Sequence, residues 1–342
     1  MRIVVIGSGV VGTIYAWKLA EAGHEVWVVA RARRRTALRH GLELSVVDQR
    51  RKRALVQATF RPQVVAQLAD VPDPELVLIC VQRPQRHTLR AQLTSCPISC
   101  PVLFLQQQWG DWRTWRELLP PERCLLGYPA IGGGRDRRGV FGWLLPESTS
   151  IGTADGGASP SLLPVASALR AAGLTVDLRT SMPALLAARA VIRVGLAGGV
   201  LKAGSVGHLA MSDSILSEVL RAIHEGLAVC AAQRIDVRQL PLVQAYCDEP
   251  ALVRRRLQRM LRRPLTRCAL GGCLAHTLPE LRELHGDMLA TAREQKVPAP
   301  VLTTLGSWFR SLPAIDRFVH AQPETMSIPR PGCDLCDNCC AG

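Results

Sequence analysis

Apolar and polar residues at the start of the chain are arranged in a pattern that predicts a strand, a helix and a second strand. Residues 3–6 are uniformly apolar, which is typical of a strand buried on both faces of a parallel sheet. Apolar residues then recur at helical spacing from Val11 to Leu19, and Gly23 is well placed to end this helix. A second apolar run at 25–29 completes the β-α-β unit.

Three glycines join the first strand to its helix at G-x-G-x-x-G spacing. Gly7 permits the tight turn, Gly9 lets a pyrophosphate approach the backbone, and Gly12 lets the helix pack close to the sheet. The N–H groups and the dipole of the first helical turn form an anion site. We therefore predict a Rossmann-type dinucleotide-binding domain, with these cofactor-binding residues: Gly7, Ser8, Gly9, Val10, Val11 and Gly12.

The end of the second strand indicates which dinucleotide is bound. An acidic residue there would hold the ribose hydroxyls of NAD, but this chain has Ala30 and Arg31, with three more arginines at 33–35. No acid is present to repel a 2′-phosphate, and a guanidinium can bind one with two hydrogen bonds. We therefore predict NADP(H), with Arg31 at the phosphate. A solvated basic loop would explain most of these arginines, but it would not explain the missing acid.

Short apolar runs continue to residue 178 and predict further strands. The clearest are 75–81 and 101–105, followed by Gln82 and by three glutamines that include Gln107. Because ligands of open α/β sheets bind at the carboxyl ends of strands, we expect Gln82 and Gln107 to face the cofactor. The other predicted strands are 43–47, 54–59, 125–129, a pair at 140–145 and 150–152, and 174–178. Helices are predicted at 36–40, 87–93 and 161–172, and a flexible glycine segment at 132–134.

From about residue 180 nearly every segment has helical periodicity. Helices are predicted at 184–200, 212–232, 251–263 and 279–296, with Pro264 ending the third. The first carries Arg189 and Arg193 one turn apart. The predicted fold class is therefore α/β, with an N-terminal Rossmann-type domain and a C-terminal all-helical domain. We divide the chain into an NADP-binding domain (1–178), a helical substrate and dimerisation domain (179–318) and a cysteine-rich tail (319–342).

Length and composition restrict the class of protein. The chain has 342 residues and a hydrophobic fraction of 48%, enough for two domains with sizeable cores. No apolar run reaches the length of a membrane span, and the first strand leaves no room for a signal peptide before it. We therefore expect a cytoplasmic protein with no membrane partner. Eight of the twelve cysteines lie in apolar segments, which indicates buried, reduced thiols.

The net charge of +14 raises the possibility of nucleic-acid binding. Basic residues cluster at 31–35, 50–53 and 254–263, but no aromatic residue interleaves with them, as a stacking platform would require. Anionic small molecules and solvated helix faces explain the charge more simply. We therefore expect no nucleic-acid partner and keep nucleic-acid binding as a third hypothesis.

Four cysteines crowd into the end of the chain at C-x-x-C-x-x-C-C spacing: Cys333, Cys336, Cys339 and Cys340. This spacing suits a soft metal, zinc above all, and it also suits thiol–disulfide exchange or an intersubunit disulfide. No second C-x-x-C lies elsewhere to complete a zinc ribbon. Zinc binding, redox chemistry and no role therefore stay open for this tail.

The layout of residues 1–312 resembles the ketopantoate reductase (2-dehydropantoate 2-reductase) family of NADP-dependent reductases. The matching features are the glycine turn at Gly7, Arg31, the strand ends at Gln82 and 106–110, and the segment PELRELHG, whose glutamate is Glu280. The resemblance implies reduction of a ketone by hydride, a substrate held between the two domains, and a homodimer.

Several polar positions of the family pattern are replaced in this chain. The family's catalytic lysine falls on Leu185, and two asparagines fall on Arg189 and Arg193. A further lysine, an asparagine and a serine correspond to Gln82, Gln107 and Cys268. Only Glu280 persists. None of the four lysines takes the missing place: Lys18, Lys52, Lys202 and Lys296.

These replacements change what the site can do. Reduction of a ketone needs a group that stabilises or protonates the developing alkoxide, and leucine does neither. Arginine stabilises the charge but rarely releases a proton, because its pKa is so high. Two arginines favour a more anionic substrate, although the alternative is a pair of domain-interface or surface arginines. His285 and His208 are candidate proton donors, and a structural role is the alternative for each.

We therefore predict an NADP(H)-dependent oxidoreductase acting on a small anionic keto acid or imine-like substrate rather than on ketopantoate. The resemblance and the replacements together select the candidate catalytic residues Arg189, Arg193, Glu280 and His285. A non-catalytic NADP-binding sensor or scaffold is the competing hypothesis, because the proton donor of the family pattern is missing.

Overall fold

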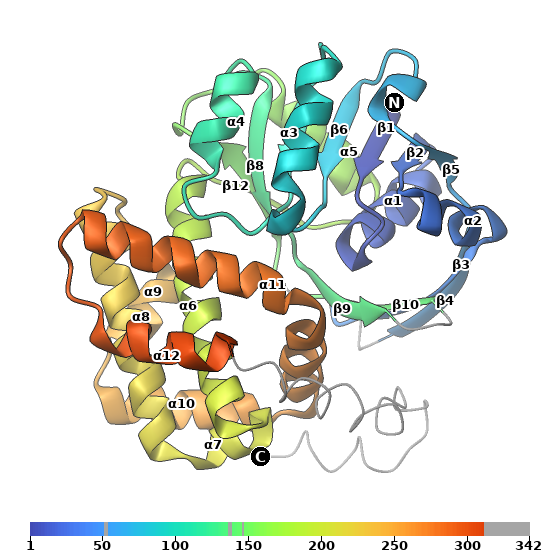
Figure 1. Cartoon of the computed structure of the whole chain (residues 1–342). Helices are drawn as coiled ribbons and strands as arrows, with labels where there is room; N and C mark the ends of the chain where they lie inside the picture. Colours follow the sequence, from blue (N-terminus) through green and yellow to red (C-terminus); the bar gives the residue numbers. More distant parts are fainter. Residues whose placement is uncertain (51–53, 136–138, 146, 311–342) are drawn as a thin grey trace.

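The computed structural model describes residues 1–50, 54–135, 139–145 and 147–310 (Figure 1). Its main sheet has eight strands in the order β12-β11-β8-β7-β6-β1-β2-β5, and β11 runs antiparallel to β8. The strands are β1 (Arg2–Ile6), β2 (Glu25–Val29), β5 (Gln63–Val65), β6 (Leu76–Ile79), β7 (Val102–Phe104), β8 (Cys124–Tyr128), β11 (Thr149–Thr153) and β12 (Val176–Leu178). The predicted β-α-β unit is thus confirmed, with β1 and β2 paired in parallel.

Helices cover both faces of this sheet. Ile3 and Val5 of β1 pack in one core with α1 and α5, while Val4 and Ile6 pack in another with α3 and α4. The alternation follows from the pleat, since successive side chains of a strand point to opposite faces. The helices of this domain are α1 (Val10–Glu21), α2 (Ala32–His40), α3 (Arg86–Ser95), α4 (Trp112–Leu118) and α5 (Leu162–Ala171), with short 3₁₀ turns η1 (Leu68–Asp70) and η2 (Arg83–Gln85).

A second sheet of four strands, in the order β4-β3-β10-β9, lies beneath α1 in Figure 1. Its strands are β3 (Leu42–Asp48), β4 (Ala54–Phe60), β9 (Ile131–Arg135) and β10 (Gly139–Leu144). Two predictions are wrong here. The glycines at 132–134 belong to strand β9, and the strand predicted at 140–145 pairs with β3 and β9 rather than with the strand at 150–152. The glycines serve close packing: a Cβ on Gly142 would lie 2.4 Å from Ile14 Cδ1 of α1.

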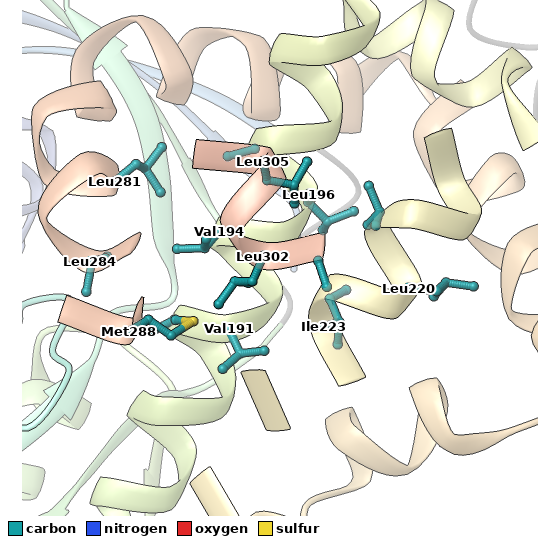
Figure 2. Close-up of a cluster of buried hydrophobic side chains, with 14 of the residues drawn as sticks. Val191, Val194, Leu196, Leu220, Ile223, Leu281, Leu284, Met288, Leu302 and Leu305 are labelled. Carbon is teal, nitrogen blue, oxygen red and sulfur yellow. The ribbon is translucent and has the colours of Figure 1, made fainter. Parts of the chain in front are cut away.

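Residues beyond β12 form a helical domain in which α6 is central. Figure 2 shows its core, where Val191 and Val194 of α6 face side chains of α8, α11 and α12. The helices are α6 (Met182–Ala203), α7 (Val206–Met211), α8 (Asp213–Ala232), α9 (Pro241–Cys247), α10 (Pro250–Arg262), α11 (Pro264–Glu294) and α12 (Pro300–Arg310). The confirmed α/β fold therefore has a Rossmann-like sheet domain followed by a helical region.

Helix α6 is long and apolar enough to cross a membrane by length and composition, contrary to our expectation that no run reaches that length. In this structure 83% of its apolar window is buried against other elements. Such burial is what the central helix of a helical domain shows, so its composition follows from its place in the core.

Prolines account for a further correction. The sequence places a helix end at Pro264 and a helix start at Pro279, but α11 begins at Pro264 and continues through Pro279. Proline is tolerated in the first turn of a helix because the N–H that it lacks has no helical partner there. Inside a helix it removes one hydrogen bond, and the packing of a 31-residue helix against α6 and α12 offsets that loss. Helices α4, α7, α9 and α12 were not predicted.

Candidate functional site

The glycine turn after β1 has the geometry of a phosphate cradle. A Cβ on Gly7 would lie 2.8 Å from the carbonyl carbon of Cys80, and one on Gly12 would lie 1.9 Å from the Gly7 oxygen. A Cβ on Gly9 would meet no atom within 4 Å. Gly7 and Gly12 therefore have no room for a side chain, because backbone atoms lie too close, whereas Gly9 faces open space. Helix α1 begins at Val10 without a side-chain cap, which leaves its first N–H groups, Val11 included, directed toward that space.

The arginines that follow β2 lie on a helix rather than in a loop. Ala30 is buried, Arg31 is the exposed residue preceding α2, and the helix starts four residues before the predicted position. No acidic residue lies in the first turn of α2. Two guanidinium nitrogens of Arg34, Nε and Nη2, are buried and have no hydrogen-bond partner. Sequence analysis placed Arg31 at the phosphate and gave Arg34 no separate role, although the spacing of Arg34 from buried Leu38 places both on the inner face of α2.

Amide side chains line the carboxyl ends of β6 and β7. Gln82 precedes η2, and Gln106 donates from Nε2 to the Val81 carbonyl at 2.7 Å. Gln107 and Gln108 are buried, and the Gln107 Oε1 and both amide atoms of Gln108 have no hydrogen-bond partner. Buried amide groups without partners are costly in a protein interior unless a ligand or water satisfies them. This edge of the sheet therefore suits a polar ligand.

An ionic network joins this edge to helix α11, and sequence analysis missed it. Arg83 is 3% exposed, and its guanidinium lies 2.9 Å from Asp111 and also pairs with Asp287 of α11. Arg86 pairs with Glu283 of the same helix at 3.0 Å. Burial raises the pKa of the Asp111 carboxyl, and Arg83 opposes that rise. The network holds α11 against the carboxyl end of β6.

Glu280 is the buried carboxyl group at the centre of this region. It is 4% exposed, its Oε1 accepts a hydrogen bond from the Arg83 backbone N–H at 3.4 Å, and its Oε2 lies 3.7 Å from Arg193 Nη2. Burial raises the pKa of Glu280, while Arg193 and the Arg83 N–H oppose the rise. A carboxyl group with a raised pKa keeps its proton to a higher pH than a free glutamate does, and a general acid benefits from that property.

The two arginines of α6 have different neighbours. Arg193 faces Glu280, whereas the Arg189 guanidinium lies 4.7 Å from the centre of the Tyr128 ring, at the end of β8. The Nε of Arg189 is buried and has no hydrogen-bond partner. Arg189 also lies near Tyr246 of α9, whose pKa is raised by burial to about 12. Arg189 therefore stands between the two domains with donor capacity that the described residues do not use.

Comparison with known proteins shows which proteins this chain resembles. The family model described as "Ketopantoate reductase PanE/ApbA" matches residues 3–156. The match covers the sheet domain up to the residues that follow β11. A 2-dehydropantoate 2-reductase of Halobacterium salinarum is 24% identical to this chain over 322 residues, which are 91% of this chain and 98% of that protein.

Solved structures share the fold over almost the whole chain. A PanE/ApbA family ketopantoate reductase from Ralstonia eutropha JMP134 is 21% identical and has a TM-score of 0.72, covering 94% of this chain and 100% of that one. A D-mandelate dehydrogenase with NADH and anilino(oxo)acetate is 16% identical and has a TM-score of 0.71, covering 93% and 99%. These matches confirm the predicted fold class. The D-mandelate dehydrogenase structures contain NADH.

Leu185, where the resemblance predicts the family's lysine, lies among apolar side chains. Leu185 is 4% exposed and packs with Met182, Leu186 and side chains of the sheet. Leu185, Arg189 and Arg193 follow one another at four-residue spacing, so they lie on one stripe of α6. Cys268, at the family's serine position, lies in α11, and its side chain is outside the described part of the structure.

The two candidate histidines lie on α11 and α7. The ring of His285 donates from Nε2 to the Leu302 carbonyl at 2.8 Å and packs against Phe309 of α12. Burial lowers its pKa. Five residues separate it from Glu280, which turns it about 140° away around α11. His285 is therefore turned away from Glu280, and its role as a proton donor stays a prediction. His208 is exposed on α7, at the opposite end of the helical domain from the sheet (Figure 1).

Among the described residues no group of three or more His, Cys, Asp or Glu side chains could hold a metal ion. The predicted zinc ligands Cys333, Cys336, Cys339 and Cys340 lie outside the described residues. A pocket of about 720 Å³ lies between α8 and α9, lined by mostly apolar side chains together with Arg234 and Arg238. It contains none of the predicted site residues, so the candidate site rests on the polar geometry at the sheet edge.

Proposed function

We propose that this protein is an NADP(H)-dependent oxidoreductase of the ketopantoate reductase type, acting on a small anionic keto acid or imine-like substrate other than ketopantoate. The observation that carries the proposal is the buried Glu280 carboxyl beside Arg193 at the carboxyl edge of the Rossmann sheet. That pair offers a proton and a positive charge, the two functions that the family's lysine would combine.

The cofactor part of the proposal is supported by the glycine turn. The open space beyond Gly9 and the uncapped start of α1 suit a pyrophosphate, and the absence of an acid after β2 suits a 2′-phosphate. NADP(H), when bound, supplies the hydride acceptor or donor. We assign the turn residues to the pyrophosphate, and Arg31 with the other arginines at the start of α2 to the adenosine end. Gln82 and Gln107 would contact the nicotinamide half from the strand ends.

The remaining chemistry belongs to three side chains. Arg193 stabilises negative charge on the substrate oxygen as the carbonyl carbon is reduced, and Glu280 donates the proton that completes the alcohol. In the reverse direction the Glu280 carboxylate accepts that proton. Arg189 binds a substrate carboxylate through its guanidinium, whose Nε has no hydrogen-bond partner in the described structure. An oxo acid substrate is also supported by the anilino(oxo)acetate bound to the D-mandelate dehydrogenase of similar fold.

The replaced lysine leaves a second candidate function. Leu185 packs in the apolar core and can neither protonate a substrate nor orient one, so the chain could bind NADP(H) as a sensor or scaffold without turnover. Steady oxidation of NADPH with any member of a keto acid and imine panel supports the enzyme. Saturable NADPH binding with no turnover across the panel supports the sensor.

The test of the proposed chemistry is Glu280→Gln. It should lower kcat by roughly 100-fold or more, because general acid catalysis contributes about that much, and leave the Kd for NADPH unchanged. Glu294→Gln, at the exposed end of the same helix, is the matched control and should keep wild-type kcat. Equal kcat for wild type and Glu280→Gln would refute the proposed acid.

We further propose a cytoplasmic homodimer that has no membrane or nucleic-acid partner, and size-exclusion chromatography with light scattering tests the dimer.

A further inference from the structure

Arg34 is an arginine of α2 with buried donors that lack hydrogen-bond partners. It lies in the first turn of α2, and its Nε and Nη2 are buried without a hydrogen-bond partner. Leu38, one turn later, is 1% exposed, so the inner face of α2 carries both residues into the domain. Buried guanidinium donors without an acceptor destabilise the folded state, unless a ligand or a water molecule accepts their hydrogen bonds.

A second guanidinium approaches Arg34 from the other sheet of the domain. Arg135 is the last residue of β9. Burial lowers the pKa of Arg34, and the nearby charges of Arg135 and Arg33 lower it further. Within the described ranges neither Arg34 nor Arg135 has an ion pair. Two like charges that lie near each other repel, and an anion bound between them removes the repulsion.

Both arginines flank the predicted cofactor cradle. Arg34 follows β2, the direct neighbour of β1 in the main sheet. Strand β9, which ends at Arg135, packs on the start of α1: a Cβ on Gly133 would lie 3.0 Å from Val10 Cγ1. The two side chains therefore come from elements that border the glycine turn, one from each sheet of the domain.

We infer that Arg34 and Arg135 together bind the 2′-phosphate of NADP(H), so that the second sheet contributes to cofactor selectivity. This inference rests on the proposed function. A phosphomonoester dianion matches two guanidinium groups, because each can donate two parallel hydrogen bonds to its oxygens. Arg31 is exposed and contributes charge near the same phosphate. Sequence analysis assigned the phosphate to Arg31 alone, since nothing in the sequence brings residue 135 near residue 34.

The experiment measures Kd for adenosine 2′,5′-bisphosphate, AMP, NADPH and NADH by calorimetry, using the full chain. Arg34→Gln and Arg135→Gln should each weaken adenosine 2′,5′-bisphosphate and NADPH by about tenfold or more, since each removes hydrogen bonds to a charged group. AMP and NADH, which lack the 2′-phosphate, should bind as they do to wild type. Arg39→Gln, in the last turn of α2, is the control and should change none of the four constants.

The possible outcomes separate this inference from the proposed function. If a substitution weakens the binding of all four ligands equally, or weakens none, the phosphate assignment is overturned and dinucleotide binding is left intact. Wild-type protein that binds NADPH no better than NADH also overturns it. Wild-type protein that binds neither nucleotide overturns both proposals. Arg135 is exposed, so its variant keeps the test usable if Arg34→Gln fails to fold, and thermal unfolding of each variant checks this.

Discussion

Glu280 shows how a single residue acquires its chemistry from its surroundings. A glutamate in water has released its proton well below neutral pH. Here burial favours the protonated form, while the guanidinium of Arg193 at 3.7 Å and the Arg83 N–H favour the carboxylate. Because the pKa is raised overall, the protonated form predominates below the raised pKa and is lost as pH increases through it. Reduction should therefore slow as the pH increases, since the acid form is the donor.

Removal of the guanidinium tests this balance without a substrate. Arg193→Gln should raise the pKa of Glu280 further, because burial remains and the opposing positive charge is gone. The pKa can be followed by carbon NMR of labelled glutamate carboxyls as a function of pH. Arg189→Gln, one turn away beside Tyr128, is the matched control and should move the Glu280 pKa less. A Glu280 pKa that is unchanged in Arg193→Gln would contradict the pairing.

At the scale of the element, β9 shows that a glycine run can be a strand held by close contacts. Gly133 has a φ of +148° and a Cβ there would lie 2.3 Å from the Phe141 carbonyl oxygen. Gly132, next to it, would place a Cβ 3.7 Å from the Trp143 ring, an ordinary contact. The run lets β9 and β10 lie close together and close to α1. Composition alone favours flexibility for such a segment, whereas the structure uses the glycines for packing.

These adjacent glycines provide a paired test. Gly133→Ala should destabilise the protein by about 2 kcal/mol or more, because its backbone conformation and the carbonyl contact both oppose a side chain. Gly132→Ala should stay within about 0.5 kcal/mol of wild type. Urea unfolding followed by circular dichroism gives both free energies of unfolding. Equal destabilisation by the two substitutions would show that β9 is not packed as described.

At the scale of the whole molecule, the sheet domain and the helical domain are joined by unequal ion pairs. Arg83 is 3% exposed between Asp111 and Asp287, whereas the Arg86 side chain is 31% exposed beside Glu283. A buried charge that loses its partner keeps its desolvation cost, and an exposed one regains water. Arg83 should therefore be the main ionic contact that holds α11 against the sheet, and with it the position of Glu280.

Substitution of the two arginines should separate these roles. Arg83→Gln should cost about 3–5 kcal/mol of unfolding free energy, as expected when a buried ion pair is broken. Arg86→Gln should cost no more than about 1 kcal/mol, the range of exposed pairs. Both values come from denaturant unfolding at low and high salt, and only the small Arg86 effect should be screened. Similar costs for both variants would contradict the assigned burial.

The sequence predicted those features that depend on residues close together in the chain. The apolar run of β1, the glycine turn and the period of α1 are close in the chain, and each follows from contacts between near neighbours. The prediction that a helix starts at Pro279 was wrong because the packing that tolerates this proline inside α11 comes from α6 and α12, which are distant in the sequence. The resemblance to a family supplied Glu280, which composition and spacing alone would not have selected.

The amino-acid sequence by itself determined the Rossmann start, the missing acid after β2, and the stripe that puts Arg189 beside Arg193. Only the tertiary structure decided that Arg193 meets Glu280, that His285 points into the helical core, and that Arg135 approaches Arg34. Arg83 and Glu280 are 197 positions apart in the chain. Electrostatic and packing energies depend on distance through space, and for such pairs only the folded chain sets that distance.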